Sequence, residues 1–337
     1  MKLLLICPPG PLPMDGYAPI HNHLFEVSKG LLRRGHEVLV VASQASLPEG
    51  ITWIKVPEAE AEAFKEYKHL LPKMDCILDF SMLKYAYLEK EKRLELRLIG
   101  CVHPSQVYGT APPVPYPCFV ATSNAHARDL AAKLGIAVRT VYYGIPDEMI
   151  ASQPPEREEE RLLFLGRFIS GKGPQIAVDV ARRMRMGISL IGEDVKVPDQ
   201  RFLIQLLQKG DGKTVSFIGH VGEDVKRGML GAASCLLLPY LAREAAYTCL
   251  PMLEAFSRGT PVVALNEGCV MEYAAKAPPE VAALIGSSIE ELPALVKASR
   301  ELKREACLSA ARNFTVSRAV DEYEALIKDV VENDLEW

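Results

Sequence analysis

Short apolar runs alternate with longer amphipathic segments along nearly all of the 337 residues, and this alternation restricts the fold more than any other feature. Leu3–Cys7 has the length and composition of a buried strand. Residues 22–34 place leucines at helical spacing and are followed by Gly35, a typical helix stop. Strand and helix patterns in this order indicate βαβ units around a mostly parallel sheet. The sequence therefore predicts an α/β fold.

The pattern runs through the first half of the chain and restarts in the second half. The expected strands are Leu3–Cys7, Glu37–Ala42, Cys76–Phe80, Leu98–Val102, Phe119–Thr122, Thr140–Tyr143, Leu162–Leu165, Ser189–Ile191, Val215–Ile218, Cys235–Leu238 and Pro261–Leu265. The expected helices are Asn22–Arg34, Ser123–Ala132 with Ser123 as its cap, Pro174–Met184, Leu250–Ser257 and a long tail helix, Ser317–Val331. Each half therefore predicts one doubly wound domain.

Two proline-rich segments interrupt this pattern. Pro104–Pro117 carries five prolines and is expected to be irregular, whereas Gln153–Glu160 combines a double proline with dense charge and reads as a linker. We thus expect a first domain at 1–152, a linker at 153–160 and a second domain at 161–315. Ligands of such sheets bind beyond the carboxyl ends of the strands, which predicts a site in a central cleft that the two domains face.

The bulk composition excludes several classes of protein. A formal net charge of −4 gives no general basis for nucleic-acid binding. No run approaches the roughly 20 apolar residues that span a bilayer, and Leu3–Cys7 is too short for a secretory signal. The eight cysteines form no CxxC pair, which favours buried thiols in a reducing cytoplasm over disulfides or zinc.

A candidate diphosphate site follows the strand Leu162–Leu165. Gly166 leaves room for close backbone approach, Arg167 and Lys172 supply two positive charges, and the next helix begins at Pro174 with unbonded N–H groups. The alternative is an ordinary strand–helix turn with two solvated cations.

Glu254 is an acid on an otherwise apolar helix between two core strands. A buried carboxylate is costly unless it has a partner, and a ribose diol can donate both hydroxyls to one carboxylate. The alternative is that Glu254 points to solvent near the helix start, where the helix dipole favours an acid.

Residues 161–273 resemble the donor-binding domain of glycosyltransferase family 4, a family of retaining enzymes with the GT-B fold. The resemblance rests on Gly166-Arg167 with Lys172-Gly173, on Leu253-Glu254-Ala255, and on Gly259-Thr-Pro-Val-Val263 followed by the loop at Asn266. It extends to Gly16-Tyr17 and to the tail, and it implies that a C-terminal helix, about 316–337, crosses back onto the first domain.

The resemblance also implies roles for individual residues. Arg167, Lys172 and Gly166 would hold the donor diphosphate, and Glu254 the ribose. The other implied donor-binding residues are Gly268, Cys269 and Val270 through their amides, and Gly16 in the opening loop. His103 would lie at the reaction centre with Arg167 and Lys172, although a structural histidine is the alternative. Backbone groups near Gly219–Gly222 would read the base.

Two departures from the family pattern concern the sugar side. The family's first donor-helix acid falls on Ala246, so Glu244 can replace it only if the loop carries a two-residue insertion. Ala18-Pro19 stands where the family has Gly-Gly, and proline removes one N–H contact to phosphate. His21 and His23 could compensate, or form a surface pair.

The resemblance implies a hexosyltransferase-like enzyme that moves a sugar from a nucleoside-diphosphate sugar to a carbohydrate, lipid or small-molecule acceptor. Pro104–Pro117 is a candidate part of the acceptor pocket. No metal or cofactor is implied beyond the donor substrate, and no Asp-x-Asp follows a strand. The alternatives are a weak or inactive nucleotide-sugar-binding protein or partner subunit, and a nucleotide-sugar epimerase. A cytoplasmic location is expected. The basic end of the first helix, with Lys29, Arg33 and Arg34, leaves peripheral membrane binding open.

Overall fold

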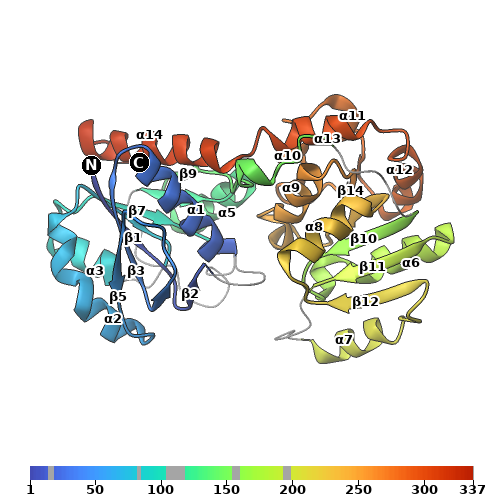
Figure 1. Ribbon diagram of the computed structural model, residues 1–337, viewed down its shortest axis with the longest axis horizontal. Helices are drawn as coiled ribbons and strands as arrows, with labels where there is room; N and C mark the ends of the chain where they lie inside the picture. Colours follow the sequence, from blue (N-terminus) through green and yellow to red (C-terminus); the bar gives the residue numbers. More distant parts are fainter. Residues whose placement is uncertain (14–18, 82–84, 104–117, 154–159, 193–198, 337) are drawn as a thin grey trace. The chain divides into compact units, whose positions relative to one another are not determined.

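The computed structural model divides the chain into two compact units (Figure 1). Unit 1 comprises Met1–Gly144 and Val316–Trp337, and unit 2 comprises Ile145–Thr315. The structure describes residues 1–13, 19–81, 85–103, 118–153, 160–192 and 199–336, without the side chains of residues 244 and 245. The predicted irregular segment 104–117, most of the predicted linker and Gly16 therefore lie outside the described residues.

Unit 1 contains a seven-stranded parallel sheet within the described residues, in the order β5-β3-β1-β6-β7-β8-β9. The chain winds outward from β1 to β3 and β5, and then resumes on the other side of β1, so the order reverses between β1 and β6. The strands are β1 (Lys2–Ile6), β3 (Glu37–Ala42), β5 (Ile51–Lys55), β6 (Cys76–Asp79), β7 (Leu98–Cys101), β8 (Phe119–Ala121) and β9 (Val138–Thr140). Two short strands, β2 (Pro11–Leu12) and β4 (Gln44–Ala45), pair separately.

The helices of unit 1 follow the capping rules expected from the sequence. The α1 helix stops just before Gly35, whose φ is +82°. The Ser123 side chain accepts a hydrogen bond from the His126 N–H at 3.2 Å and caps α5. The helices are α1 (Pro19–Arg33), α2 (Glu60–Tyr67), η1 (Lys68–Lys73), α3 (Tyr85–Lys92), α5 (Asn124–Leu134) and α14 (Val316–Glu332).

The C-terminal helix α14 belongs to unit 1 and packs against α1 (Figure 1). Its residues Tyr323 and Ile327 are buried in the same core as Leu24 of α1. At the rim of this contact, Arg34 pairs with Asp321 and, at 2.9 Å, with Glu324. The predicted return of the C-terminal helix to the first domain is therefore confirmed.

Gly30 allows α14 to approach α1, because a Cβ placed on it would lie 2.3 Å from Cγ2 of Val320. We expect Gly30→Ala to destabilise unit 1 by about 1–3 kcal/mol, since the stiff valine cannot move aside and overpacking outweighs the helix propensity of alanine. Both tryptophans, Trp53 and Trp337, belong to unit 1, so urea unfolding followed by tryptophan fluorescence reports this unit.

Val320→Ala provides the matched control for this prediction. It removes the obstructing methyl groups, so the double variant should be more stable than the sum of the two single effects indicates. Additive losses would show that the Gly30–Val320 contact is not the cause.

Unit 2 contains a six-stranded parallel sheet within the described residues, in the order β12-β11-β10-β13-β14-β15. Its strands are β10 (Arg161–Leu165), β11 (Gly187–Ile191), β12 (Val215–Gly219), β13 (Cys235–Leu238), β14 (Val262–Leu265) and β15 (Ile285–Gly286). Its helices are η2 (Asp147–Met149), η3 (Ser170–Lys172), α6 (Pro174–Met184), α7 (Gln200–Leu207), α8 (Glu223–Ala232), η4 (Arg243–Ala246), α9 (Leu250–Ser257), α10 (Val270–Ala274), α11 (Pro279–Ala282), η5 (Ile289–Glu291), α12 (Leu292–Ala298) and α13 (Arg304–Ala311).

The strand order of unit 2 reverses between β10 and β13. The helices that follow β10 and β11 belong to one winding direction, and α8 and α9 belong to the other, where they pack against each other. In doubly wound sheets, a ligand site forms at such a reversal, outside the carboxyl ends of the two strands. The residues that follow β10 and β13 are therefore the first to consider.

Candidate functional site

Lys172 lies at the reversal point of the unit 2 sheet. It ends the short helix η3 after β10, its side chain is only 7% exposed, and its ammonium lies 4.6 Å from the centre of the Tyr240 ring, which follows β13. The Leu241 N–H donates to the Gly171 carbonyl at 2.9 Å and ties the two loops together. The side chain is thus held over an aromatic face, in a cation–π contact.

Gly173 fixes the backbone beside this cation. Its φ is +75°, and a Cβ placed on it would lie 1.9 Å from the carbonyl oxygen of Pro239. Only glycine combines this left-handed conformation with such close backbone packing. The turn that the sequence singles out is therefore built around contact between the loops after β10 and β13.

The pKa of the Lys172 ammonium is lowered to about 8, chiefly by burial and to a smaller extent by the nearby Arg167 guanidinium, while the thiols of Cys249 and Cys269 act in the opposite direction. Lys172 therefore remains mostly charged at neutral pH. Arg167 is exposed, and its side chain forms no hydrogen bond or ion pair with the residues that the structure describes. The pair is suited to an anion that carries two negative charges.

The predicted glycine loop lies close to Lys172, as its electrostatic coupling to Cys269 shows. Gly268 has a φ of +57°, and a Cβ there would lie 2.4 Å from the Ala246 carbonyl oxygen. The Cys269 N–H donates to that same carbonyl at 2.8 Å, and the Val270 N–H donates to Glu267 at 3.1 Å. Two of the three predicted amides thus already bind protein carbonyls within the described part of the chain.

Ala246 is fully buried beneath this loop, at the end of η4. The position that carries an acid in the family pattern therefore presents a methyl group, together with a carbonyl that already accepts the hydrogen bond from the Cys269 N–H. The backbone of Glu244 lies in η4, but its side chain is outside the described residues, so its proposed substitution for the missing acid stays a prediction.

Glu254 lies on α9 between Leu253 and Ala255, which are both fully buried. Its own side chain is 24% exposed, and its Oε1 accepts a hydrogen bond from Nζ of Lys226 at 2.7 Å. Burial raises the pKa of Glu254 and Lys226 lowers it. The alternative of a carboxylate that simply points to solvent does not hold, because Lys226 on α8 is its partner. Sequence reasoning missed Lys226, which is 28 residues away along the chain.

Glycines stand at the carboxyl ends of three neighbouring strands of unit 2: Gly166 directly after β10, Gly192 directly after β11, and Gly219 as the last residue of β12. The Gly166 N–H donates to the Ile191 carbonyl at 3.0 Å, and the Gly192 N–H donates to the Gly219 carbonyl at 3.1 Å. A Cβ on Gly192 would lie 1.8 Å from the Gly166 oxygen, so Gly192 is needed for this approach although the sequence did not single it out. The carboxyl edge of β10, β11 and β12 is therefore bare backbone.

His103 belongs to unit 1, two residues beyond β7, and is 7% exposed. Its ring stacks on Tyr143, with centroids 5.9 Å apart, and the Tyr143 ring stacks on His23 at 4.1 Å. Burial lowers the pKa of His23 to about 3, so this imidazole is neutral at physiological pH.

The interpretation of His21 and His23 as a surface pair is wrong. His23 is 5% exposed and stacked on Tyr143, and Nε2 of His21 lies 3.1 Å from the Pro9 carbonyl oxygen, to which it donates. Helix α1 starts at Pro19, and Ile20, His21 and His23 at its beginning are all buried. The neutral ring of His23 supplies no positive charge in place of the missing Gly-Gly contact.

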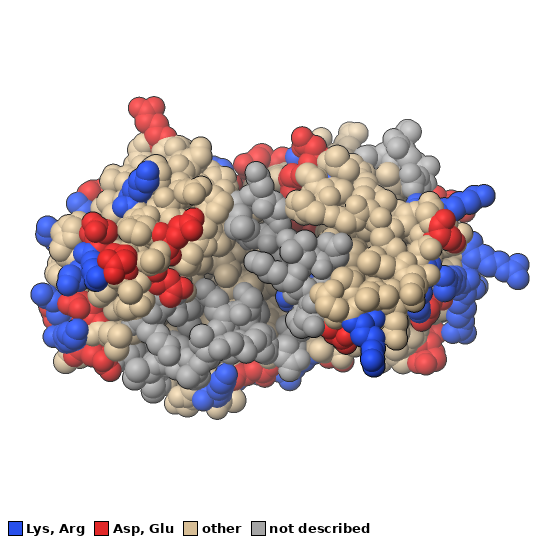
Figure 2. Space-filling model, turned by 90° about the horizontal axis from the view of Figure 1, so that it is seen from below, with Lys and Arg blue, Asp and Glu red and all other residues tan. Residues whose placement is uncertain are grey.

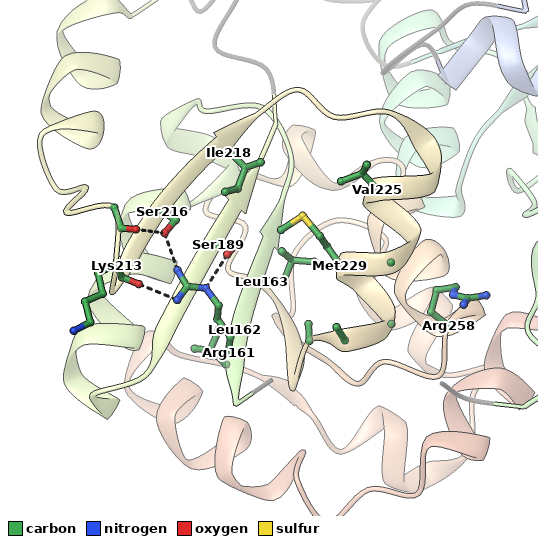
Figure 3. A pocket seen from close by; sticks show the side chains of 15 residues that line it. Arg161, Leu162, Leu163, Ser189, Lys213, Ser216, Ile218, Val225, Met229 and Arg258 are labelled. Atoms are coloured by element: carbon green, nitrogen blue, oxygen red, sulfur yellow. Dashed lines mark hydrogen bonds between the residues drawn. The ribbon is translucent and has the colours of Figure 1, made fainter. Parts of the chain in front are cut away.

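A pocket of about 820 Å³ lies elsewhere in unit 2, between the sheet strands β10–β12 and helix α8 (Figure 3). Arg161 projects into it and donates to Ser189 and Ser216, each at 2.8 Å, while Val225 and Met229 of α8 line the opposite wall. None of the predicted site residues lines this pocket. Because the donor atoms of Arg161 are already bonded, we do not assign the predicted chemistry to it.

The remaining described features agree with the composition. On the face of unit 1 in Figure 2, Lys and Arg intermingle with Asp and Glu instead of forming a patch of one sign. All eight cysteines are buried free thiols. Among the described residues, no helix combines the length and apolar character that a bilayer crossing requires.

Comparison with known proteins finds a family that matches part of the chain. Residues 159–302 match the family described as "Glycosyl transferases group 1". No curated protein sequence matches the chain significantly.

Solved structures match the whole chain in fold. AviGT4, a glycosyltransferase involved in avilamycin A biosynthesis, is 21% identical with a TM-score of 0.76, covering 100% of this chain and 99% of its own. Alr3699/HepE of Anabaena, solved in complex with UDP-glucose, is 16% identical with a TM-score of 0.72, covering 98% and 100%. WaaG, a glycosyltransferase involved in lipopolysaccharide biosynthesis, is 16% identical with a TM-score of 0.65, covering 96% and 99%.

Two doubly wound α/β units, matched over nearly the whole chain by these solved structures, define the GT-B fold. Residues 159–302 match the group 1 glycosyltransferases, enzymes that transfer a sugar from a nucleotide sugar. The predicted family and the predicted α/β, GT-B fold class are thereby confirmed.

Proposed function

We propose that the chain is a retaining transferase that moves a sugar from a nucleoside-diphosphate sugar to a carbohydrate, lipid or small-molecule acceptor without a metal ion. The observation that carries this proposal is the buried Lys172 beside the exposed Arg167, at the sheet reversal between β10 and β13. Two fixed cations there can stabilise the charge that develops on a departing diphosphate, the role a metal would otherwise fill.

The proposed donor domain is 161–315. Within it, the diphosphate binds Arg167, Lys172 and the amino end of α6, and the ribose binds Glu254. Gly268 is the amide of the glycine loop that does not donate to a backbone carbonyl in the described part of the chain, which supports a contact with the donor. The first domain, 1–152 with the C-terminal helix, supplies the acceptor side and His103, and 153–160 is the linker.

A weakly active or inactive nucleotide-sugar-binding protein is the second candidate. The buried methyl of Ala246 supports it, because this position offers no carboxylate to a donor sugar. The relative HepE was solved with UDP-glucose, which makes UDP-glucose the first donor to test.

The function is tested in two steps. A thermal-shift screen with UDP, GDP and ADP should reveal one stabilising nucleotide, because a ligand that binds only the folded state raises its stability. The corresponding nucleotide sugars are then incubated with and without an acceptor panel. Acceptor-dependent release of the nucleoside diphosphate supports the transferase, tight binding without turnover supports the binding protein, and epimerised donor without acceptor would overturn both.

The affinity for the nucleoside diphosphate should depend on pH through Lys172. The ammonium has a lowered pKa of about 8 in the free protein, and a bound anion raises it, so binding above about pH 8 takes up a proton. Affinity should be nearly constant from about pH 6.5 to 7.5 and then fall, approaching tenfold per pH unit. Titration calorimetry measures this, and Lys172→Met should bind more weakly with a flat profile. An unchanged slope in that variant would place the titrating group elsewhere.

A further inference from the structure

The carboxylate of Glu254 has one occupied and one unoccupied oxygen. Nζ of Lys226 lies 2.7 Å from Oε1 of Glu254 and 2.8 Å from Oε2 of Glu223, so a single ammonium bridges two acids. Within the described residues, no hydrogen bond reaches Oε2 of Glu254. The Glu254 side chain is 24% exposed. Lys226 therefore holds Oε1 in place, while a ligand could reach Oε2.

Among the described residues, the other elements packed around Glu254 place no further charge beside its carboxylate. The strands β13 and β14 contribute only Cys, Leu, Val and Ala side chains. Arg304 of α13 donates to the carbonyls of Gly259, Gly231 and Arg258 at the far end of α9. Just after α9, Arg258 lies near Arg227 of α8. The charged groups that act on Glu254 are therefore Lys226 and Glu223.

We infer that Lys226 is a positioning residue for nucleotide selection: by holding Oε1, it keeps Glu254 an acceptor-only carboxylate with Oε2 available to the ribose hydroxyls. This inference rests on the proposed function, in which Glu254 binds the ribose. It adds that Lys226, which need not touch the nucleotide, sets the preference for a ribonucleotide over its 2′-deoxy counterpart.

The chemistry of the carboxyl group gives the reason. An ionised carboxylate only accepts hydrogen bonds and can receive two hydroxyls, whereas a protonated one must donate through one oxygen. Burial raises the pKa of Glu254, and the ion pair with Lys226 opposes that rise. Without Lys226, burial acts unopposed, so Glu254 takes up a proton as the pH falls and the 2′-hydroxyl contributes less.

The test compares each of UDP, GDP and ADP with its 2′-deoxy form by titration calorimetry, at about pH 6 and about pH 8. For the base that binds, wild-type protein should prefer the ribonucleotide by about tenfold or more at both pH values, as expected for a hydrogen bond to a charged acceptor. Lys226→Met should keep much of this preference at about pH 8 and lose most of it at about pH 6. Lys226→Arg, which preserves the charge, should behave as wild type.

Two control variants separate the positioning role of Lys226 from a general effect of substitution on the fold. Glu254→Gln should reduce the preference toward onefold at both pH values. Lys209→Met removes the lysine of another 2.7 Å ion pair in unit 2, with Asp179, and should leave the preference unchanged. Thermal unfolding of each variant establishes that it is folded.

The outcomes distinguish a failure of the ribose assignment of Glu254 from a failure of the role of Lys226. If no nucleotide binds, or if wild-type protein does not prefer the ribonucleotide, the ribose assignment of the proposed function fails and the inference fails with it. If wild-type protein shows the preference and Lys226→Met retains it equally at both pH values, only the role of Lys226 is refuted. Loss of the preference in Lys226→Arg as well would also refute it.

Discussion

Replacing Arg167 and Lys172 together by alanine is expected to reduce sugar transfer by at least about 10³-fold, the largest functional effect that the structure predicts. Each single replacement should cost about 10²–10³-fold, because each removes a charge aimed at the departing diphosphate in a partly buried site. The two losses need not multiply, since both cations act on the same group.

The measurement is the rate of acceptor-dependent nucleoside-diphosphate release at saturating donor, together with the KM for the donor. A fall in kcat identifies charge stabilisation in the transition state, whereas a rise in KM alone would indicate ground-state binding. Arg183→Ala is the matched control, because Arg183 is an exposed arginine of α6 in the same unit. Wild-type turnover in the double variant would remove the basis of the proposed site.

Gly173→Ala is expected to have the largest effect on stability, lowering the free energy of unfolding of unit 2 by about 2–4 kcal/mol. The new Cβ would lie 1.9 Å from the Pro239 carbonyl oxygen, and backbone atoms cannot rotate away as a side chain can. The loops after β10 and β13 would have to separate, which also displaces Lys172 from the Tyr240 ring. The free energy of unfolding, measured by calorimetry, and the affinity for the nucleoside diphosphate should therefore fall together.

Gly212→Ala isolates the clash from the backbone strain. Gly212 has a φ of +70°, close to the +75° of Gly173, but a Cβ there meets no atom within 4 Å. It should lose only about 1–2 kcal/mol, the cost of placing alanine in the left-handed region, and keep the affinity for diphosphate. Equal losses in the two variants would show that conformation, and not contact with Pro239, explains the requirement for glycine.

The sequence allowed the order of the elements to be predicted because local patterns encode it. The apolar run of β1, the stop at Gly35 and the cap at Ser123 are each decided by a few adjacent residues, and the structure contains all three. The surface interpretation of His21 and His23 failed for the opposite reason. Whether a histidine on the first turn of a helix is buried depends on what packs over it, here Tyr143 and the Pro9 carbonyl.

The same difference separates the residues of the candidate site: some are marked by their adjacent sequence, and others depend on contacts with distant residues. Arg167 and Lys172 could be identified because they follow a strand directly, in a recognisable turn. The ion pair of Lys226 with Glu254 joins two helices, and the need for glycine at position 192 arises from contact with Gly166 on another strand. Such requirements appear only once the chain is folded, because neither partner is marked in its own stretch of sequence.

The placement of α14 in unit 1 has a consequence for synthesis on the ribosome. Unit 2 is one continuous segment, whereas the core of unit 1 includes Tyr323 and Ile327, which are translated after all of unit 2. Domains usually fold in the order in which they emerge, yet here the amino-terminal sheet must wait for its last helix. We therefore expect nascent chains that stop before Val316 to carry a folded unit 2 beside a protease-sensitive unit 1.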